Sequence, residues 1–271
     1  MLRRFILLAL LVTLAGCEDK TEIARAKVAQ MGLPFTKEAF IDHARKGNAA
    51  AVNLFLEAGM DPDAQNKDGQ TALMAATLSD QVETIRVLVA GGANVNAVNK
   101  FGGTALMTAA WKGNTEIMKS LLVEGADVDI QANLGITALM FAARENRFEA
   151  LTILLEKGAD VGLKDKTGVT ALMLAAIKGN IDCAAALLEK GAELDVRSNT
   201  GDTALIYAAD AGNIEMVTLL LDRGADPNAR SNEGNTALSR AVEKRHEAIS
   251  QTLLARGAEP IAAVSAERKS E

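Results

Sequence analysis

The residues that could carry out catalysis are few and lie far apart in this sequence. Its two histidines are His43 and His246. The repeating sequence between them, described below, predicts stacked helices about 8–10 Å apart, which would separate the two imidazoles by on the order of 50–60 Å. No base–nucleophile pair and no metal cluster could therefore use both.

The two cysteines, Cys17 and Cys183, cannot form a disulfide framework because they allow one bridge at most. Cys183 occupies the position where other repeats have Ile117 and Met216, on the expected apolar face of a helix. A cysteine in such a position is typical of a buried structural thiol, whereas a reactive thiol has to be accessible.

The acidic turns do not have the pattern of calcium sites. Asp61-Pro-Asp63 and Asp127-Val-Asp129 lack the spacing of a calcium loop, and they recur where turns favour Asp for its side-chain hydrogen bond. The glycines follow the repeat and form no phosphate-binding loop. We expect no metal, no cofactor and no enzymatic activity.

Composition limits the remaining function classes. The chain has 271 residues, of which 49% are apolar and 3% aromatic, with a formal net charge of −6. This is enough apolar material for a folded core, and a core with few aromatic residues is typical of closely packed helices. Nucleic-acid binding is not expected because it requires clustered Lys and Arg.

The N-terminus has the pattern of an export signal. A basic start, Met1–Arg4, is followed by the apolar run Phe5–Ala15. The run is too short to span a bilayer, which takes roughly twenty residues. A basic start, a short apolar run and small residues at its end indicate a signal peptide. The alternatives are an uncleaved anchor and a buried helix.

The end of this run, Leu14-Ala15-Gly16-Cys17, resembles the bacterial lipobox. The resemblance implies that residues 1–16 are removed and that the thiol of Cys17 is lipidated. Several acyl chains would then hold the protein stably at a membrane. We expect a lipid-anchored protein in the bacterial periplasm, at the inner or the outer membrane, with residues 17–34 as a charged tether that could include a short helix.

The body of the chain is one unit repeated every 33 residues. A Thr-Ala-Leu triplet recurs without a slip in register, starting at Thr71, Thr104, Thr137, Thr170, Thr203 and Thr236. A glycine series keeps the same interval, at Gly59, Gly92, Gly125, Gly158, Gly191, Gly224 and Gly257. Such a period indicates a repeat protein.

A single unit predicts two short helices. Thr104 is a good N-cap for a helix over Ala105–Lys112, and Gly113 can adopt the left-handed conformation that ends it. A second helix over Glu116–Glu124 has Ile117, Met118, Leu121 and Leu122 on one face, and Gly125 ends it. Helices this short are unstable alone, so neighbouring units must stack.

The order and period of these motifs resemble the ankyrin repeat. The resemblance covers residues 35–260 and implies an all-α solenoid of about seven helix-turn-helix units joined by extended turns. The first and last units have polar outer faces, as terminal caps require, and residues 261–271 form a flexible tail. One departure recurs: the family's Pro and His are replaced by pairs such as Ala105 and Met107.

The resemblance also implies where a partner binds. In the ankyrin pattern, the residue seven after each Thr and the turn tips face a concave groove. Apolar side chains that packing does not require occupy these positions, together with one arginine, and we assign them to a protein-binding surface: Leu78, Phe101, Trp111, Leu134, Ile136, Arg144, Val169 and Ile177. The alternative is that they lie flat against neighbouring repeats. Phe141, Leu174 and Tyr207, four after Thr, are interpreted as core.

The function that follows is non-catalytic binding of one or more envelope proteins by a monomer. Exported bacterial proteins that resemble this one include immunity factors that block cell-wall hydrolases or lipases. That resemblance favours inhibition of, or immunity to, a periplasmic hydrolase or toxin. The alternative is a scaffold or stress-defence accessory protein that localises a periplasmic partner.

Overall fold

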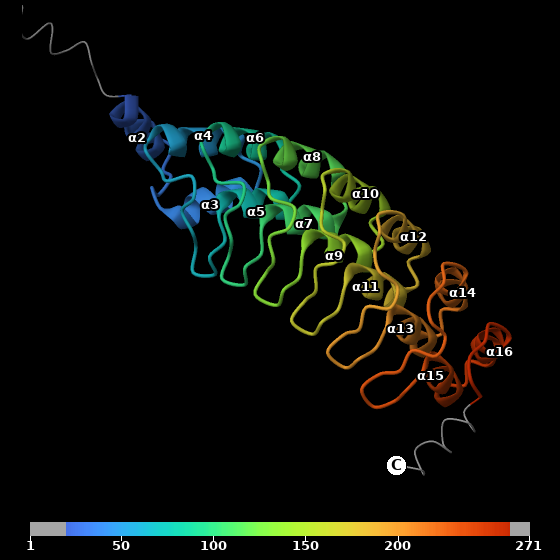
Figure 1. The fold of residues 1–271 in the computed structure, drawn as a ribbon. Coiled ribbons are helices and arrows are strands. Elements are labelled where there is room, and N and C mark those ends of the chain that lie inside the picture. Colours follow the sequence, from blue (N-terminus) through green and yellow to red (C-terminus); the bar gives the residue numbers. More distant parts are fainter. Residues whose placement is uncertain (1–19, 261–271) are drawn as a thin grey trace, which may run out of the picture. The chain divides into compact units, whose positions relative to one another are not determined.

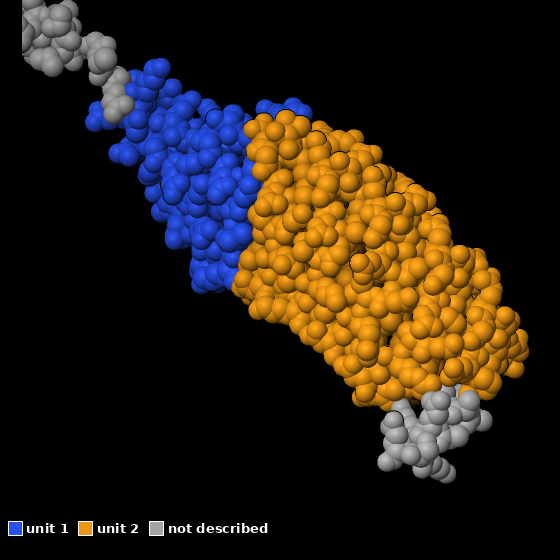
Figure 2. Space-filling view, viewed as in Figure 1, with its two compact units in different colours: residues 1–100 blue, residues 101–271 orange. Residues whose placement is uncertain are grey.

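The computed structural model describes residues 20–260. The expected signal peptide, Cys17 and the C-terminal tail after residue 260 lie outside the described residues. These contain fifteen helices and no strand, which confirms the expected all-α fold (Figure 1). Fourteen of the helices form seven helix-turn-helix pairs. The chain divides into unit 1, residues 1–100, and unit 2, residues 101–271 (Figure 2).

Unit 1 holds two pairs and one additional helix. Its helices are α2 (Lys20–Gln30), α3 (Lys37–Arg45), α4 (Ala49–Glu57), α5 (Ala72–Leu78) and α6 (Val82–Ala90). The first helices of the two pairs, α3 and α5, pack against each other. The second helices, α4 and α6, form a second row.

Helix α2 extends that second row and packs against α4. Its Ala24 and Val28 are buried. The guanidinium of Arg25 donates a hydrogen bond from Nε to the carbonyl of Ala58, at 2.9 Å. Part of the segment expected to act as a tether is therefore a helix that covers α4 of the first repeat.

Unit 2 holds five pairs. Its first helices are α7 (Ala105–Lys112), α9 (Ala138–Arg144), α11 (Ala171–Lys178), α13 (Ala204–Ala211) and α15 (Ala237–Glu243). Its second helices are α8 (Thr115–Val123), α10 (Phe148–Glu156), α12 (Ile181–Glu189), α14 (Ile214–Asp222) and α16 (Glu247–Ala255). Each helix packs against its own partner and against the equivalent helix of the next pair.

The repeated threonine caps each first helix from α5 to α15. In α7 the hydroxyl of Thr104 accepts a hydrogen bond from the backbone N–H of Met107, at 3.2 Å. Such a cap stabilises a helix by about 1 kcal/mol. The capping threonines are buried, so the bond also satisfies a hydroxyl that water cannot reach. The helix cap and the need to satisfy a buried hydroxyl explain why the threonine recurs in each repeat from Thr71 to Thr236.

The residue that ends each first helix takes the left-handed conformation. Gly113 has φ 77° there, as expected. Three repeats have no glycine at this position, and Asp80, Asn146 and Arg245 adopt φ 57°, 53° and 61°. The turn is thus kept even where a side chain makes it unfavourable.

The apolar face of each second helix forms the core. In α8 the buried residues are Ile117, Met118, Leu121 and Leu122, which are the four that the helical spacing predicted. Leu154 occupies the position of Leu121 in the next repeat, and neither side chain is exposed.

We expect Leu121→Ala and Leu154→Ala each to lower the free energy of unfolding by about 2–5 kcal/mol, because each leaves a cavity in the core. Denaturant unfolding measures the loss. Val123→Ala is the matched control, because Val123 lies on the same helix and is 78% exposed. Equal effects of Leu121→Ala and Val123→Ala would contradict the assigned core face.

Candidate functional site

Two turn tips of unit 2 carry exposed apolar side chains. Phe101 is 71% exposed and Leu134 is 65% exposed. The carbonyl of Phe101 accepts a hydrogen bond from the N–H of Asn133 at 2.8 Å, and that of Leu134 accepts one from Lys166 at 2.9 Å. Backbone bonds therefore link successive turns and hold both tips in place while their side chains remain accessible.

Trp111 lies near the C-terminal end of α7 and is 42% exposed. Its backbone carbonyl accepts a hydrogen bond from Nε of Arg147, at 3.1 Å. The indole is thus a surface side chain on a fixed backbone. Phe101 precedes α7 and Trp111 nearly ends it, so exposed aromatic side chains flank the two ends of one helix.

The remaining aliphatic residues assigned to this surface are less exposed. Ile136 and Ile177 are half-buried. Val169 is only 8% exposed, so its assignment to an exposed surface is wrong. Its N–H donates to Oδ1 of Asp165 at 2.9 Å, and its carbonyl accepts from the N–H of Asp165 at 2.9 Å. These two bonds fix the backbone of Val169 within its own turn.

Arg144 is also half-buried, and its charge is already matched. Its Nε donates to the carboxylate of Glu145 at 2.9 Å. Its guanidinium carbon lies 5.3 Å from the ring centroid of Phe141. The arginine is therefore held between a carboxylate and an aromatic ring.

Sequence reasoning did not recognise a row of partly exposed positions on the first helices of unit 2, four residues after the capping Thr. Phe141, Leu174 and Tyr207 were expected in the core, but all three are half-buried. The same position holds Thr108 and Arg240 in other repeats, also half-buried. A polar residue at one copy of a repeated position indicates that the position reaches solvent, and this signal was available in the sequence.

The row ends in a charged pocket at α13 and α15. Its lining is Asp202, Ile206, Tyr207, Asp210, Arg240 and Lys244. Nζ of Lys244 lies 3.9 Å from Asp210, and Arg240 lies 3.1 Å from Glu243. Along this row, apolar side chains thus give way to a charged residue, Arg240, in the last repeat.

Leu78 belongs to unit 1. It is the last residue of α5 and is 43% exposed. Its exposure agrees with the surface position expected for it.

The two histidines make local contacts in different units. In unit 1, Nδ1 of His43 lies 3.4 Å from the side-chain nitrogen of Asn48. In unit 2, Nε2 of His246 lies 3.3 Å from the carbonyl oxygen of Asp210. Within residues 20–260, no group of three His, Cys, Asp or Glu side chains is arranged to hold a metal ion. No helix in the same range is long and apolar enough to cross a membrane.

Cys183 is fully buried, in agreement with its assignment as a structural thiol. Burial, with smaller contributions from the charges of Asp182 and Glu149, raises the pKa of its thiol to about 11. Because the raised pKa disfavours the thiolate, the group is a poor nucleophile at neutral pH.

We expect the Cys183 thiol of the folded protein to react with a soluble disulfide reagent at pH 8 about a hundredfold more slowly than in denaturant. The raised pKa lowers the thiolate fraction by about that factor. A Cys17→Ser background leaves Cys183 as the single thiol, and absorbance of the released chromophore measures the rate. Equal rates in both states would contradict a buried thiol.

Comparison with known proteins identifies the fold family. The family model of ankyrin repeats (3 copies) matches residues 40–132, 109–198 and 191–263. A search of curated proteins found no match. The three matches together cover well over half of the chain, and they coincide with the helix pairs described above. The chain belongs to the ankyrin-repeat family.

Proposed function

We propose that this protein binds a protein partner through an apolar strip on unit 2, made of Phe101, Trp111, Leu134, Ile136 and Ile177. Ankyrin repeats are protein-interaction modules, and the family assignment supports this class of function. The observation that carries the choice of surface is the exposure of Phe101 and Leu134 on turns held by backbone hydrogen bonds.

The energetics favour such a strip as an interface. Large apolar side chains exposed to water gain free energy when a partner buries them, at about 25 cal/mol per Å². Aromatic residues dominate binding hot spots, and the strip contains the chain's one tryptophan. Because hydrogen bonds already fix the turns, the partner would not have to order them on binding.

We further propose that the partner is an envelope enzyme, such as a cell-wall hydrolase or a toxin, and that binding inhibits it. The lipobox-like segment ending at Cys17 supports an anchored, exported protein. A rigid binding surface suits obstruction of an active site. Purification of the partner, followed by titration of its hydrolytic activity with this protein, tests the proposal. Full activity at saturating binding would exclude inhibition and leave a scaffold role.

Cys17→Ser should leave the protein unprocessed or release it from membranes, because no thiol remains at that position to receive lipid. Membrane fractionation with mass spectrometry of the N-terminus measures the effect. Cys183→Ser is the control and should stay lipidated and membrane-bound. A Cys17→Ser protein that is processed and membrane-bound at the wild-type level would contradict the anchor.

Phe101→Ala and Trp111→Ala should separate binding from stability. Each should weaken partner binding by about 2 kcal/mol, roughly thirtyfold in affinity. Each should change the free energy of unfolding by no more than about 0.5–1 kcal/mol, because surface side chains contribute little to it. The partner is first captured by pull-down and identified by mass spectrometry, and affinity is then measured with the purified pair.

Two variants serve as controls for that experiment. Val123→Ala removes an exposed apolar side chain from the second helix α8, and Glu243→Ala removes a charge from the first helix α15. Neither should change affinity. If Trp111→Ala unfolds the protein while the folded fraction binds normally, the indole has a structural role and the strip is misassigned.

A further inference from the structure

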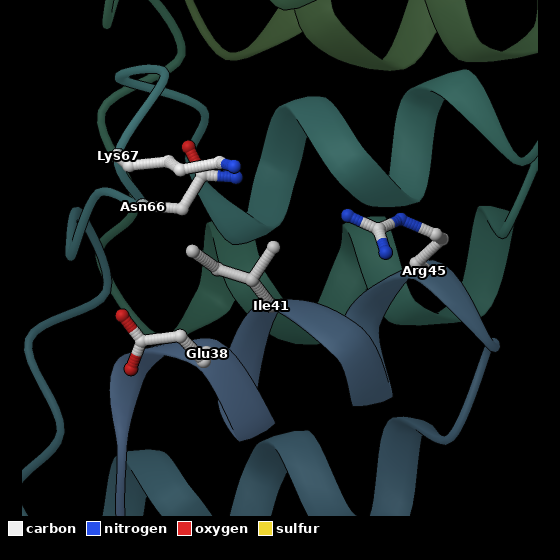
Figure 3. A pocket seen from close by; sticks show the side chains of 5 residues that line it. All are labelled: Glu38, Ile41, Arg45, Asn66 and Lys67. Carbon is white, nitrogen blue, oxygen red and sulfur yellow. The ribbon is translucent and has the colours of Figure 1, made fainter.

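A pocket in unit 1 lies between α3 and the turn that precedes α5. Its lining is Glu38, Ile41, Arg45, Asn66 and Lys67 (Figure 3). Arg45 stands at the repeat position of Trp111, two repeats earlier, and faces the turn residues Asn66 and Lys67 across the pocket. The buried side chain of Ile41 lies between them as an apolar floor.

The nitrogen atoms of three side chains converge on this pocket. Oδ1 of Asn66 accepts hydrogen bonds from the N–H groups of Asp68 and Gln70, at 2.9 and 3.0 Å. Because backbone N–H groups can bond only to the oxygen of the carboxamide, Nδ2 is the end that remains to donate. Figure 3 shows the side-chain nitrogens of Asn66 and Lys67 pointing together toward the side of the pocket where Arg45 lies.

The positive charge of the pocket is incompletely matched. Lys67 has no ion pair with any residue of the described range. Arg45 has two long contacts, 3.8 Å to Asp42 and 3.4 Å to Oε1 of Gln70. The carboxylate of Glu38 also borders the pocket and points away from Arg45 (Figure 3). Nitrogen donors therefore outnumber the acceptors that they can reach.

The same three positions recur in unit 2, three repeats later, as Arg144, Asp165 and Lys166. There the arginine is bonded to the carboxylate of Glu145, at 2.9 Å. The residue equivalent to Glu145 in unit 1 is Lys46. Lys46 is a cation and forms its own ion pair with Asp42, at 2.7 Å. Where unit 2 supplies a carboxylate to its arginine, unit 1 has a second positive charge, which takes the short contact to Asp42 and leaves Arg45 the long one.

The turn residues Asn66 of unit 1 and Asp165 of unit 2 differ in the same way. Oδ1 of Asp165 holds its turn as Asn66 does, by accepting from the N–H groups of Thr167 and Val169 at 2.8 and 2.9 Å. The other polar atom of the Asp165 side chain, Oδ2, is an acceptor, whereas the other polar atom of Asn66, Nδ2, is a donor. The pocket of unit 1 is thus arranged for an additional acceptor that residues 20–260 do not provide.

We propose that this pocket is a subsite for a carboxylate of the partner protein, either an Asp or Glu side chain or the C-terminus. The proposal rests on the proposed protein-binding function. The carboxylate oxygens would accept from Lys67 and Asn66 on one side and from Arg45 on the other, and the adjoining methylene would lie over Ile41. Charge-assisted hydrogen bonds of this kind are among the stronger polar contacts in proteins.

The test uses the full chain, purified in detergent and labelled with nitrogen-15, and needs no partner. Sodium acetate is titrated at constant ionic strength, with chloride as the balancing anion. We expect saturable shifts of the backbone N–H signals at Asn66–Gln70 and of the Nε–H signal of Arg45. Lys67→Met should weaken acetate binding about threefold to tenfold. Glu38→Gln should strengthen it, because a nearby negative charge is removed.

Lys166→Met is the matched control, since it removes the lysine at the equivalent position of unit 2, and it should leave the shifts unchanged. Shifts that do not saturate, or that Lys166→Met reduces as much as Lys67→Met, would overturn the proposal. Saturation by inorganic phosphate but not by acetate would also overturn it, in favour of a phosphate site. A failed pull-down with intact acetate binding would contradict the proposed partner and not the anion pocket.

Discussion

The fold depends on the apolar surface that neighbouring repeats bury against each other. The helices of the seven pairs have seven to nine residues each, too few for a stable helix in water. Their stability comes from the apolar faces that successive pairs bury against each other, as Leu121 and Leu154 do. In a repeat protein a residue interacts mainly with its own and adjacent repeats, and the total stability is close to a sum over neighbours.

This constraint divides the repeat into two kinds of position. Positions that contact the next repeat are occupied mainly by Ala, Leu and Met, by other apolar residues such as Ile117 and Cys183, and by the capping Thr. The turn tips and the outer side of each first helix are not needed for stacking, so they differ from repeat to repeat. The exposed aromatics of unit 2 and the cationic pocket of unit 1 both occupy such positions, and each differs from its own equivalent elsewhere in the chain.

Much of the fold could be predicted because the same pattern occurs several times in the chain, so each position can be compared with its equivalents in other repeats. The caps at Thr104 and Gly113 and the core face of α8 follow from local hydrogen bonding and helical spacing. The burial of Val169 could not be predicted, because side chains of an irregular turn follow no helical or strand period. Phe141 was wrongly assigned to the core, because an aromatic side chain is compatible both with a buried position and with a half-buried position in a groove. Helix α2 has a weak apolar pattern, and its packing on α4 becomes visible only in three dimensions.

Helix α2 also has a mechanical consequence. It begins three residues after Cys17 and is held to the first repeat by Ala24, Val28 and the bond from Arg25 to Ala58. If Cys17 carries the proposed membrane anchor, a load between it and a partner bound on the repeats would pass through these contacts before it reached any repeat. The first element to yield under tension would be α2. Its detachment from α4 would lengthen the connection to the membrane while the binding surface stayed folded.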